Sequence, residues 1–316
     1  MISVKKSTLK RVLIIIITAL IAFSAVSMIV TKIIYDSVFV RYDGEPIPAA
    51  APLTDMVNSR EKQDYYSGNN RLSGYLYRSH GDNATGTLIV LAPGFHAGAD
   101  DYLWQIKSLL DYGWSVFAFD ATGSCDSEGD SYVGFPQVLW DMEATLDYIE
   151  ENDRFGYDEI ALMGHSRGGY AVCCALGSEY DISAVVTVSG VNSAMEGIIG
   201  SATEYVGPLA YGNYGFLWLY QAMLFGPETL NKNADEEISN SDVPVLVIHG
   251  AMDEDVPMDR YSIISHADEI ESDRVEYVIC SEPDQDGHTD LLFDEDGTAN
   301  RELMAQINDF LIRSIP

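Results

Sequence analysis

Basic residues are scarce in this 316-residue chain: 18 Lys and Arg stand against 49 Asp and Glu, giving a formal net charge of -31 at pH 7. A surface with that charge repels phosphate backbones, so the composition argues against a nucleic-acid partner. Acidic surfaces also keep proteins soluble, so the charge alone identifies no ligand. We find no internal repeat and no low-complexity tract. The length is enough for one large α/β domain plus an appendage, and a hydrophobic fraction of 47% allows a sizeable core.

Cysteine is also rare, and the four that occur have no spacing typical of a zinc site. Cys173 and Cys174 are adjacent in a segment predicted to be helical, so they cannot easily bridge each other. The other two are Cys125 and Cys280. A domain outside the cell could form a disulfide, but we expect buried free thiols. The sequence implies neither a metal nor another cofactor.

The basic residues that are present gather near the N-terminus, between positions 5 and 11, directly before an apolar run. That run, residues 12–30 (VLIIIITALIAFSAVSMIV), is uncharged over about 20 residues and is long enough to cross a bilayer as a helix. Positive charge on its N-terminal side predicts a cytoplasmic N-terminus, with the bulk of the chain outside the cell. We therefore expect a cytoplasmic stub and a membrane anchor over residues 1–34.

A cleaved signal peptide is the alternative, which would make the protein secreted. Residues 22–24 (AFS) and 25–27 (AVS) resemble small-residue cleavage sites. The apolar run continues past both to Val30, which favours an uncleaved anchor. Residues 35–60 are rich in proline and alanine, so we expect a loose linker there. One domain should follow over residues 61–316.

Strands and helices alternate through that domain. The segment 64–79 predicts an antiparallel hairpin with a turn near Gly68. Residues 87–94 (TLIVLAPG) form a continuous apolar run, typical of a strand buried on both faces. Helical spacing follows most strands, and one such helix is expected at 258–271, placing His266 on the surface. The alternation predicts an α/β fold with a mostly parallel sheet, helices on both faces and ligands outside the carboxyl ends of the strands.

One long insertion interrupts the alternation. Residues 191–240 separate two core strands and are rich in Tyr, Phe, Leu and Gly. A structureless loop of that length would be unusual. We expect a small, partly helical cap folded over the strand ends.

The stretch ALMGHSRGGY, residues 161–170, fits the pattern G-x-S-x-G of a nucleophile elbow. A strand there must turn sharply into a helix so that the hydroxyl of Ser166 stands clear of its backbone. Side chains at Gly164 and Gly168 would clash in such a turn. The helix N-terminus beneath the serine would favour negative charge. Ser166 is therefore the candidate nucleophile.

A serine hydroxyl needs an adjacent base. Among the six histidines, His288 lies in a polar loop after the last strand and can reach over the sheet edge to Ser166. His165 is inside the elbow and is expected to point away. The acid that orients the base is Asp253, which follows a strand by a short turn. Asp255 is the alternative.

An oxyanion hole needs two backbone N–H groups aimed at the developing charge. One belongs to the residue after the nucleophile, Arg167. The other should follow the strand 87–94, where Gly94 places the N–H of Phe95 at the strand end. His96 is a further candidate for contact with the substrate.

The combination of motifs resembles the alpha/beta hydrolases from about residue 60 to the end. The matching pieces are PGF at 93–95, DATGSCDSEG at 120–129, GHSRGG at 164–169, HGAMDEDVP at 249–257 and GH at 287–288. The chain order Ser, Asp, His is that of the same family. Two positions depart from the family pattern: Cys125 stands in place of a glycine, and Pro93 in place of a histidine. These departures leave the three candidate residues intact but obscure the subfamily.

The resemblance implies a serine hydrolase that cleaves carboxylic esters through an acyl-enzyme, using Ser166, Asp253 and His288. The apolar cap favours a small acyl or aryl ester as substrate. A peptidase with the same triad is the alternative, in which Glu196 or Glu204 of the cap would bind a free amino terminus. A surface binding module that has lost catalysis is a third possibility. A fold of this kind does not fix the substrate.

Overall fold

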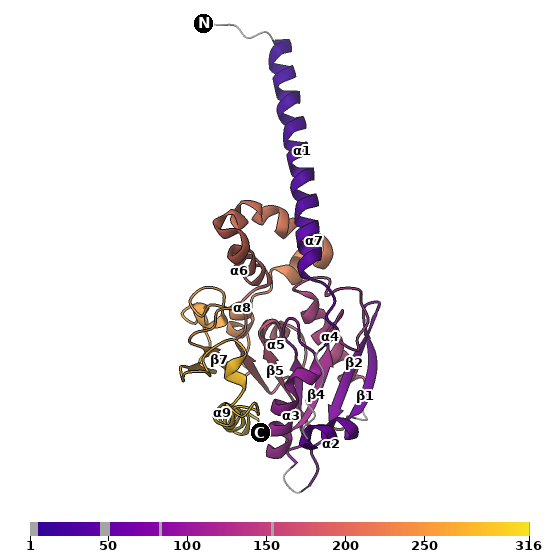
Figure 1. Cartoon of the computed structure of the whole chain (residues 1–316), viewed down its shortest axis with the longest axis vertical. Coiled ribbons are helices and arrows are strands. Elements are labelled where there is room, and N and C mark those ends of the chain that lie inside the picture. Colours follow the sequence, from indigo (N-terminus) through magenta and orange to yellow (C-terminus); the bar gives the residue numbers. More distant parts are fainter. Residues whose placement is uncertain (1–5, 45–50, 82–83, 153–154, 316) are drawn as a thin grey trace.

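The computed structural model describes residues 6–44, 51–81, 84–152 and 155–315. Within them, eight strands form one sheet in the order β1-β2-β4-β3-β5-β6-β7-β8 (Figure 1). The strands are β1 (Glu61–Ser67), β2 (Asn70–Tyr77), β3 (Thr87–Ala92), β4 (Ser115–Asp120), β5 (Glu159–His165), β6 (Ala184–Val188), β7 (Val245–Gly250) and β8 (Val275–Cys280). Strands β3 to β8 all run parallel to one another. Strand β2 pairs antiparallel with β4, and β1 pairs antiparallel with β2.

The predicted hairpin is confirmed as β1 and β2. Ser67 pairs with Asn70 across the turn, and Gly68 between them has φ 57°, a conformation that glycine adopts without a steric penalty. The hairpin extends the sheet beyond β4, with which β2 pairs antiparallel.

Helices cover both faces of the sheet, as predicted. One face is covered by α2 (Ala51–Ser59), α3 (Leu103–Tyr112) and α9 (Arg301–Ser314), and the other by α4 (Gln137–Glu150), α5 (Arg167–Cys174) and α8 (Ala234–Ser239). A hydrophobic core lies on each face of the sheet, and successive residues of β3 point into the two cores alternately. Leu88 and Val90 belong to one core, and Ile89 and Leu91 to the other. A strand buried on both faces needs a continuous apolar run, which is what the sequence has there. The described residues also form short 3-10 helices: η1 (Ala99–Tyr102), η2 (Ala175–Gly177), η3 (Gly207–Asn213), η4 (Ile263–His266) and η5 (Asp290–Leu292).

The helix expected at 258–271 is not formed; the structure has the short turn η4 instead. The side chain of Ser262 accepts a hydrogen bond from the N–H of Ser265 (3.0 Å), and the hydroxyl of Ser265 donates to the carbonyl of Ser262 (2.6 Å). These local side-chain bonds compete with helix propagation and close the turn on itself. His266 therefore ends a turn that packs against the domain, with only part of its side chain exposed.

The insertion folds as α6 (Ala194–Val206), η3, α7 (Tyr214–Leu230) and α8. Ser193 caps α6 by accepting a hydrogen bond from the N–H of Glu196. Within α7, Gly226 has φ 77° and Pro227 follows, so the helix is kinked there. Figure 1 shows α6 and α7 standing above the sheet, with α7 beside the lower end of α1.

Helix α1 (Lys6–Val38) is the long N-terminal rod of Figure 1. Its stretch Thr8–Val38 is long and apolar enough to cross a membrane, and the most apolar window of that stretch has no residue buried within the structure. The helix continues past the predicted end of the anchor at residue 34. Tyr35 and Phe39, by contrast, are buried against the domain.

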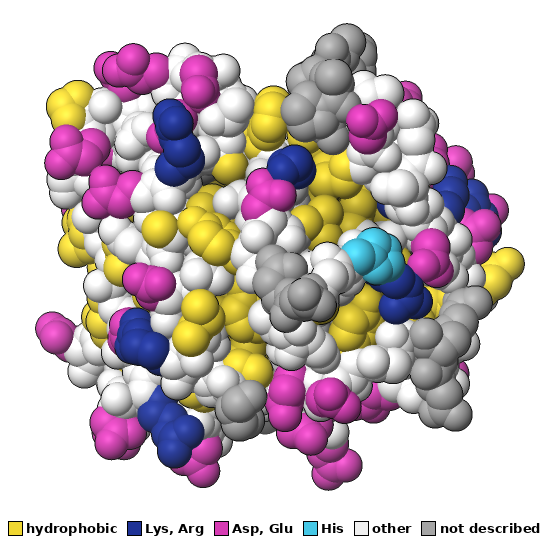
Figure 2. All heavy atoms as spheres, turned by 90° about the horizontal axis from the view of Figure 1, so that it is seen from below, with side chains coloured by type: hydrophobic (Ala, Val, Ile, Leu, Met, Phe, Trp, Pro, Cys, Tyr) yellow, Lys and Arg dark blue, Asp and Glu magenta, His cyan; other side chains and the backbone are white. Residues whose placement is uncertain are grey.

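The segment expected to be a loose linker is ordered where the structure describes it. The N–H of Tyr42 donates to the carbonyl of Gly123, and the N–H of Cys125 donates back to the carbonyl of Tyr42. Residues 51–59 form α2, which packs on the domain through Leu53. Residues 45–50 lie outside the described part of the chain. The end of the domain far from α1 carries acidic side chains around its edge, with fewer basic ones among them (Figure 2).

Candidate active site

Ser166 occupies the turn between β5 and α5. Its backbone has φ 55° and ψ −119°, a conformation that residues other than glycine seldom adopt. Its N–H donates to the carbonyl of Val188 on the neighbouring strand β6 (2.8 Å), which holds the turn in place. Because α5 begins at Arg167, the positive end of the helix dipole lies at the serine.

The glycines around Ser166 are required by close approach of the backbone. A Cβ on Gly164 would overlap the carbonyl of Gly168, and a Cβ on Gly168 would overlap the carbonyl of Ala92 at the end of β3. The predicted clash at both glycines is therefore confirmed. A Cβ on Gly94 would lie 3.4 Å from that of Ser166, so the loop after β3 runs directly beside the serine.

Asp253 and His288 are brought together across two loops. The Nδ1 atom of His288 lies 2.8 Å from Oδ2 of Asp253. The other carboxylate oxygen, Oδ1, accepts the N–H of Val256 (2.8 Å), and Nε2 of His249 lies 3.3 Å from Oδ2. Burial opposes ionisation of Asp253, but the hydrogen bonds from His249 and His288 outweigh it and hold the pKa of the carboxyl below its usual value. Asp253 is therefore ionised and positioned against the His288 ring.

A close approach of backbone aligns the loops that carry these two residues. The N–H of Met252 donates to the carbonyl of Asp286 (2.8 Å). A Cβ on Gly250, at the end of β7, would overlap the same carbonyl. The glycine thus lets the loop after β8 lie directly on the loop after β7. Asp255, the alternative acid, is exposed.

No hydrogen bond joins Ser166 Oγ to the His288 ring among the residues that the structure describes. The two residues are linked through His165 instead. Nε2 of His165 lies 2.9 Å from the carbonyl oxygen of His288, and the two imidazole rings are 4.8 Å apart. The sequence predicted that His165 points away from the serine, and it gave no sign of this contact with the candidate base.

A chain of hydrogen bonds fixes the tautomer of His165. Because a carbonyl only accepts, Nε2 carries the proton, and Nδ1 accepts from the hydroxyl of Tyr102 (3.0 Å). The Tyr102 oxygen in turn accepts the N–H of Gly94 (3.0 Å). Burial lowers the pKa of His165 to about 3, and the neighbouring His288 acts in the same direction. A neutral imidazole therefore connects the loop after β3 to the loop of His288.

Phe95 and Arg167, whose N–H groups are the predicted oxyanion donors, come from two segments that lie next to each other. Gly94 contacts the Ser166 turn, and Phe95 follows it. The guanidinium carbon of Arg167 lies 5.7 Å from the centre of the Phe95 ring. The next residue, His96, is exposed and has φ 51°, so the chain turns sharply just after the candidate donor. Arg167 is the first residue of α5, where backbone N–H groups have no partner within the helix.

The side chain of Arg167 is a feature that the sequence did not reveal. It is fully buried, its guanidinium lies 4.6 Å from the centre of the Tyr132 ring, and none of its three nitrogens has a hydrogen-bond partner among the described residues. Burial lowers the pKa of the guanidinium, yet arginine stays charged in proteins. A positive charge is thus stacked on aromatic rings beside the nucleophile elbow.

The lower end of α1 covers this region. The ring of Phe39, the residue directly after α1, lies 5.4 Å from that of Phe95. The hydroxyl of Tyr35 donates to Oε1 of Gln221 in α7 (3.3 Å). The N-terminal helix, the insertion and the loop after β3 therefore meet above the candidate site.

Two carboxylates of the insertion, Glu196 and Glu204, are the candidates for binding the amino terminus of a peptide substrate. Glu196 is engaged with His266, with its Oε1 3.1 Å from Nε2 of the ring. The side chain of Glu204 lies outside the described residues. All four cysteines are free; Cys173 and Cys174 are buried as expected, whereas Cys125 and Cys280 are half-buried.

Parts of the chain match known proteins in sequence. Residues 87–223 match the family model described as alpha/beta hydrolase fold. A proline iminopeptidase of Saccharolobus solfataricus is 32% identical over 122 residues, a match that covers 37% of each chain.

Solved structures agree on the architecture. An esterase of Pyrococcus furiosus superposes with a TM-score of 0.62 and 19% identity, covering 88% of this chain and all of the other. The protein Est1E of Butyrivibrio proteoclasticus, solved with ferulic acid bound, superposes with a TM-score of 0.60 and 19% identity, covering 80% of this chain and 98% of that one. At such identities the likeness shows the fold alone, and that fold is the alpha/beta hydrolase fold.

Proposed function

We propose that this chain, which has the alpha/beta hydrolase fold, is a membrane-anchored serine hydrolase that cleaves carboxylic esters. The observation that carries the proposal is the pair formed by Asp253 and His288, 2.8 Å apart, in the neighbourhood of a strained serine at a helix N-terminus. The chain order Ser166, Asp253, His288 is the order of the triad residues in hydrolases of this fold, which supports the proposal.

In the proposed mechanism, Ser166 Oγ attacks the acyl carbon while Nε2 of His288 takes the hydroxyl proton. Nδ1 of His288 is bonded to Asp253, so Nε2 is the nitrogen left for the serine, and the carboxylate stabilises the imidazolium that forms. The N–H groups of Phe95 and Arg167 donate hydrogen bonds to the carbonyl oxygen and stabilise the negative charge that develops on it. The imidazolium then protonates the leaving alcohol.

Deacylation repeats these steps with water in place of the serine. His288 takes a proton from water, the hydroxide attacks the acyl carbon, and Ser166 leaves with the proton from the imidazolium. The missing hydrogen bond between Ser166 and His288 forms on binding of substrate, since catalytic hydrogen bonds in unliganded sites are often long. The buried charge of Arg167 adds a positive potential where the oxyanion develops.

The test is labelling by a fluorophosphonate together with hydrolysis of short p-nitrophenyl esters, using the full-length chain in detergent. We expect wild type to label and turn over, and Ser166→Ala to do neither. Ser281→Ala, which removes an exposed serine after β8, is the matched control and should behave as wild type. Labelling that persists in Ser166→Ala would exclude this nucleophile, and an unreactive wild type would favour a binding module.

Ester cleavage is favoured over amide cleavage by the insertion. Glu196, a carboxylate considered for binding an amino terminus, is occupied by His266. The likeness to the iminopeptidase, which spans 37% of that protein, keeps a peptidase as the second candidate. Parallel assays with simple esters and aminoacyl anilides separate the two. Faster turnover of the anilides would overturn the ester assignment.

The proposed anchor is α1, with the N-terminus in the cytoplasm and the hydrolase domain outside the cell. Two features of α1 support an uncleaved helix. Its apolar side chains are exposed along the stretch that would face lipid, and Phe23 within that stretch packs on Phe216 of α7 with ring centres 6.0 Å apart. N-terminal sequencing of the mature protein tests the anchor: a start near Ala25 or Met28 would identify a signal peptide and a secreted enzyme.

A further inference from the structure

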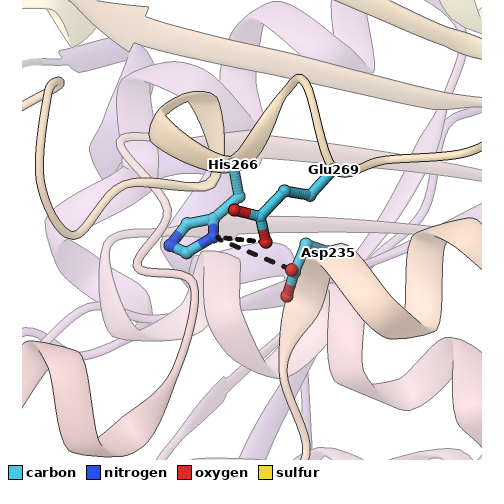
Figure 3. Close-up of side chains that lie close together, drawn as sticks. All are labelled: Asp235, His266 and Glu269. Carbon is cyan, nitrogen blue, oxygen red and sulfur yellow. Dashed lines mark hydrogen bonds and ion pairs between the residues drawn. The ribbon is translucent and has the colours of Figure 1, made fainter.

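Three ionisable side chains converge at the surface between the insertion and the core (Figure 3). Nδ1 of His266 lies 3.4 Å from Oε2 of Glu269 and 3.8 Å from Oδ2 of Asp235. The three candidate ligand atoms all lie within 4.8 Å of one another. Asp235 belongs to α8 of the insertion, whereas His266 and Glu269 follow β7.

A fourth residue sets the direction of the imidazole. Nε2 of His266 lies 3.1 Å from Oε1 of Glu196 in α6. A carboxylate only accepts, so Nε2 carries a proton and donates it to Glu196. In the neutral ring the lone pair of Nδ1 then faces the carboxylates of Asp235 and Glu269. This is the arrangement by which a carboxylate orients a metal-binding histidine from behind.

The carboxylates of the cluster outnumber the basic side chains that pair with them. Asp235 is 8% exposed, and its Oδ1 has no hydrogen-bond partner in the described part of the chain. Among those residues, His266 is the one basic group that pairs with Glu196, Asp235 or Glu269. Burying a carboxylate with an unpaired oxygen is costly unless a cation or a donor satisfies it.

We propose that Asp235, His266 and Glu269 bind a divalent metal ion, with Glu196 orienting the imidazole. Ligands about 2.0–2.1 Å from a tetrahedral Zn²⁺ lie roughly 3.3–3.4 Å from one another. The distances of 3.4 and 3.8 Å from Nδ1 are close to that edge. An imidazole nitrogen with two carboxylate oxygens suits zinc, and imidazole is not a ligand that calcium prefers.

A surface hollow of about 280 Å³ adjoins two of the proposed ligands. It is lined by Asp235, Glu236, Ser239, Asn240, Glu269 and Glu271. Its four carboxylates would attract a cation, and two of them are the proposed ligands. The site is separate from Ser166, Asp253 and His288, and it joins α8 and α6 of the insertion to the turn after β7. The ion therefore pins the cap to the core and takes no part in the chemistry.

Protonation of His266 is the competing way to balance the cluster, and zinc titration distinguishes the two. The full-length chain, stripped with a chelator, is titrated with Zn²⁺ while calorimetry records binding and Tm is measured. We expect one site, and a rise in Tm of about 5 °C at a hundredfold excess over Kd. Absence of binding, or of any Tm rise, would overturn the proposal.

Variants assign the ligands. His266→Gln and Asp235→Asn should abolish the rise in Tm, and Glu196→Gln should weaken zinc binding by about 10- to 100-fold. His80→Gln, which removes an exposed histidine outside the cluster, is the control and should leave binding unchanged. A Tm rise that survives both His266→Gln and Asp235→Asn overturns the site, as does an equal rise with Ca²⁺ that is independent of His266.

Fluorophosphonate labelling of Ser166 reports whether each variant is folded, and calorimetric binding does not depend on it. Labelling that is retained alongside lost zinc binding supports the site. If wild type binds zinc in the expected way but does not label, the proposed hydrolase function fails while the metal site stands.

Discussion

The imidazole of His165 donates a hydrogen bond to the carbonyl oxygen of His288, with 2.9 Å between nitrogen and oxygen. The residue before the candidate nucleophile thereby fixes the backbone of the candidate base. A single hydrogen bond contributes about 1 kcal/mol, or roughly five- to tenfold in rate.

We expect His165→Leu to lower kcat by about tenfold with little change in KM, because the ring of His288 is less well held. His165→Gln, whose amide can donate to the same carbonyl, should recover most of the loss. Steady-state kinetics with a p-nitrophenyl ester measures both variants. Equal losses in the two would show that the hydrogen bond to His288 is not the cause.

Asp253 should be the acid of the triad. Asp253→Asn exchanges the carboxylate that holds His288 Nδ1 for an amide and removes the charge that stabilises the imidazolium. We expect kcat to fall by about 10³- to 10⁴-fold. Asp255→Asn, at the exposed alternative position, should retain wild-type kcat, and a larger loss there than at Asp253 would reverse the assignment.

The neutral state of His165 makes stability depend on pH. Its folded-state pKa is about 3, whereas an unfolded histidine titrates near about 6.5. The unfolded chain binds the proton more readily, so this residue's contribution is fully present above about pH 6.5 and falls by about 1.4 kcal/mol per pH unit below it. The stability gap between wild type and His165→Gln should narrow by about 2 kcal/mol from pH 7 to pH 5. Urea unfolding measures it, and a constant gap would mean that His165 is not buried neutral.

Gly168→Ala should destabilise the fold because the new Cβ would overlap the carbonyl of Ala92. We expect a loss of at least about 2 kcal/mol in the free energy of unfolding, together with loss of fluorophosphonate labelling. Gly212→Ala, in η3 with no atom within 4 Å of the added Cβ, is the matched control. Similar stability of the two variants would contradict the packing described at the elbow.

Phe39→Ala tests the contact between α1 and the active-site loop. Phe39 is 4% exposed and packs on Phe95, so we expect a loss of about 3 kcal/mol in stability and lower esterase activity. Val38→Ala, at the neighbouring exposed position, should change stability by less than about 0.5 kcal/mol. Thermal unfolding and ester hydrolysis measure both, and an unaffected Phe39→Ala would detach α1 from the site.

The backbone of the site could be predicted from the sequence because its requirements are local. The elbow needs small residues on both sides of Ser166, and glycines stand there. Asp253 and His288 each follow a strand of a parallel sheet, and the carboxyl ends of such strands share one edge. Their hydrogen bond follows from the topology.

The remaining features depend on partners that sequence patterns do not reveal. His165 binds a backbone carbonyl 123 residues away, and any residue can supply a carbonyl. Arg167 is buried against aromatic rings although arginine is usually exposed. The docking of α1 did leave a signal: Thr31, Tyr35 and Phe39, all buried, are spaced four apart on one helix face, but the prolines after them favoured a linker. The expected helix at 258–271 failed because two serines close a turn on themselves.

Helix α1 is continuous from its apolar stretch to Val38, which under the proposed topology fixes the position of the domain relative to the membrane. From Val30 to Val38 the helix rises about 12 Å, and the ring of the next residue, Phe39, packs directly on Phe95. The loop after β3, which carries Phe95 beside the candidate site, is then held at a fixed height and orientation above the lipid headgroups. Such an enzyme meets molecules that leave or enter the bilayer beside it before those that diffuse in from bulk solution. Proteolytic cleavage within α1 would release the domain from the membrane and would also disturb the packing of Phe39 on Phe95.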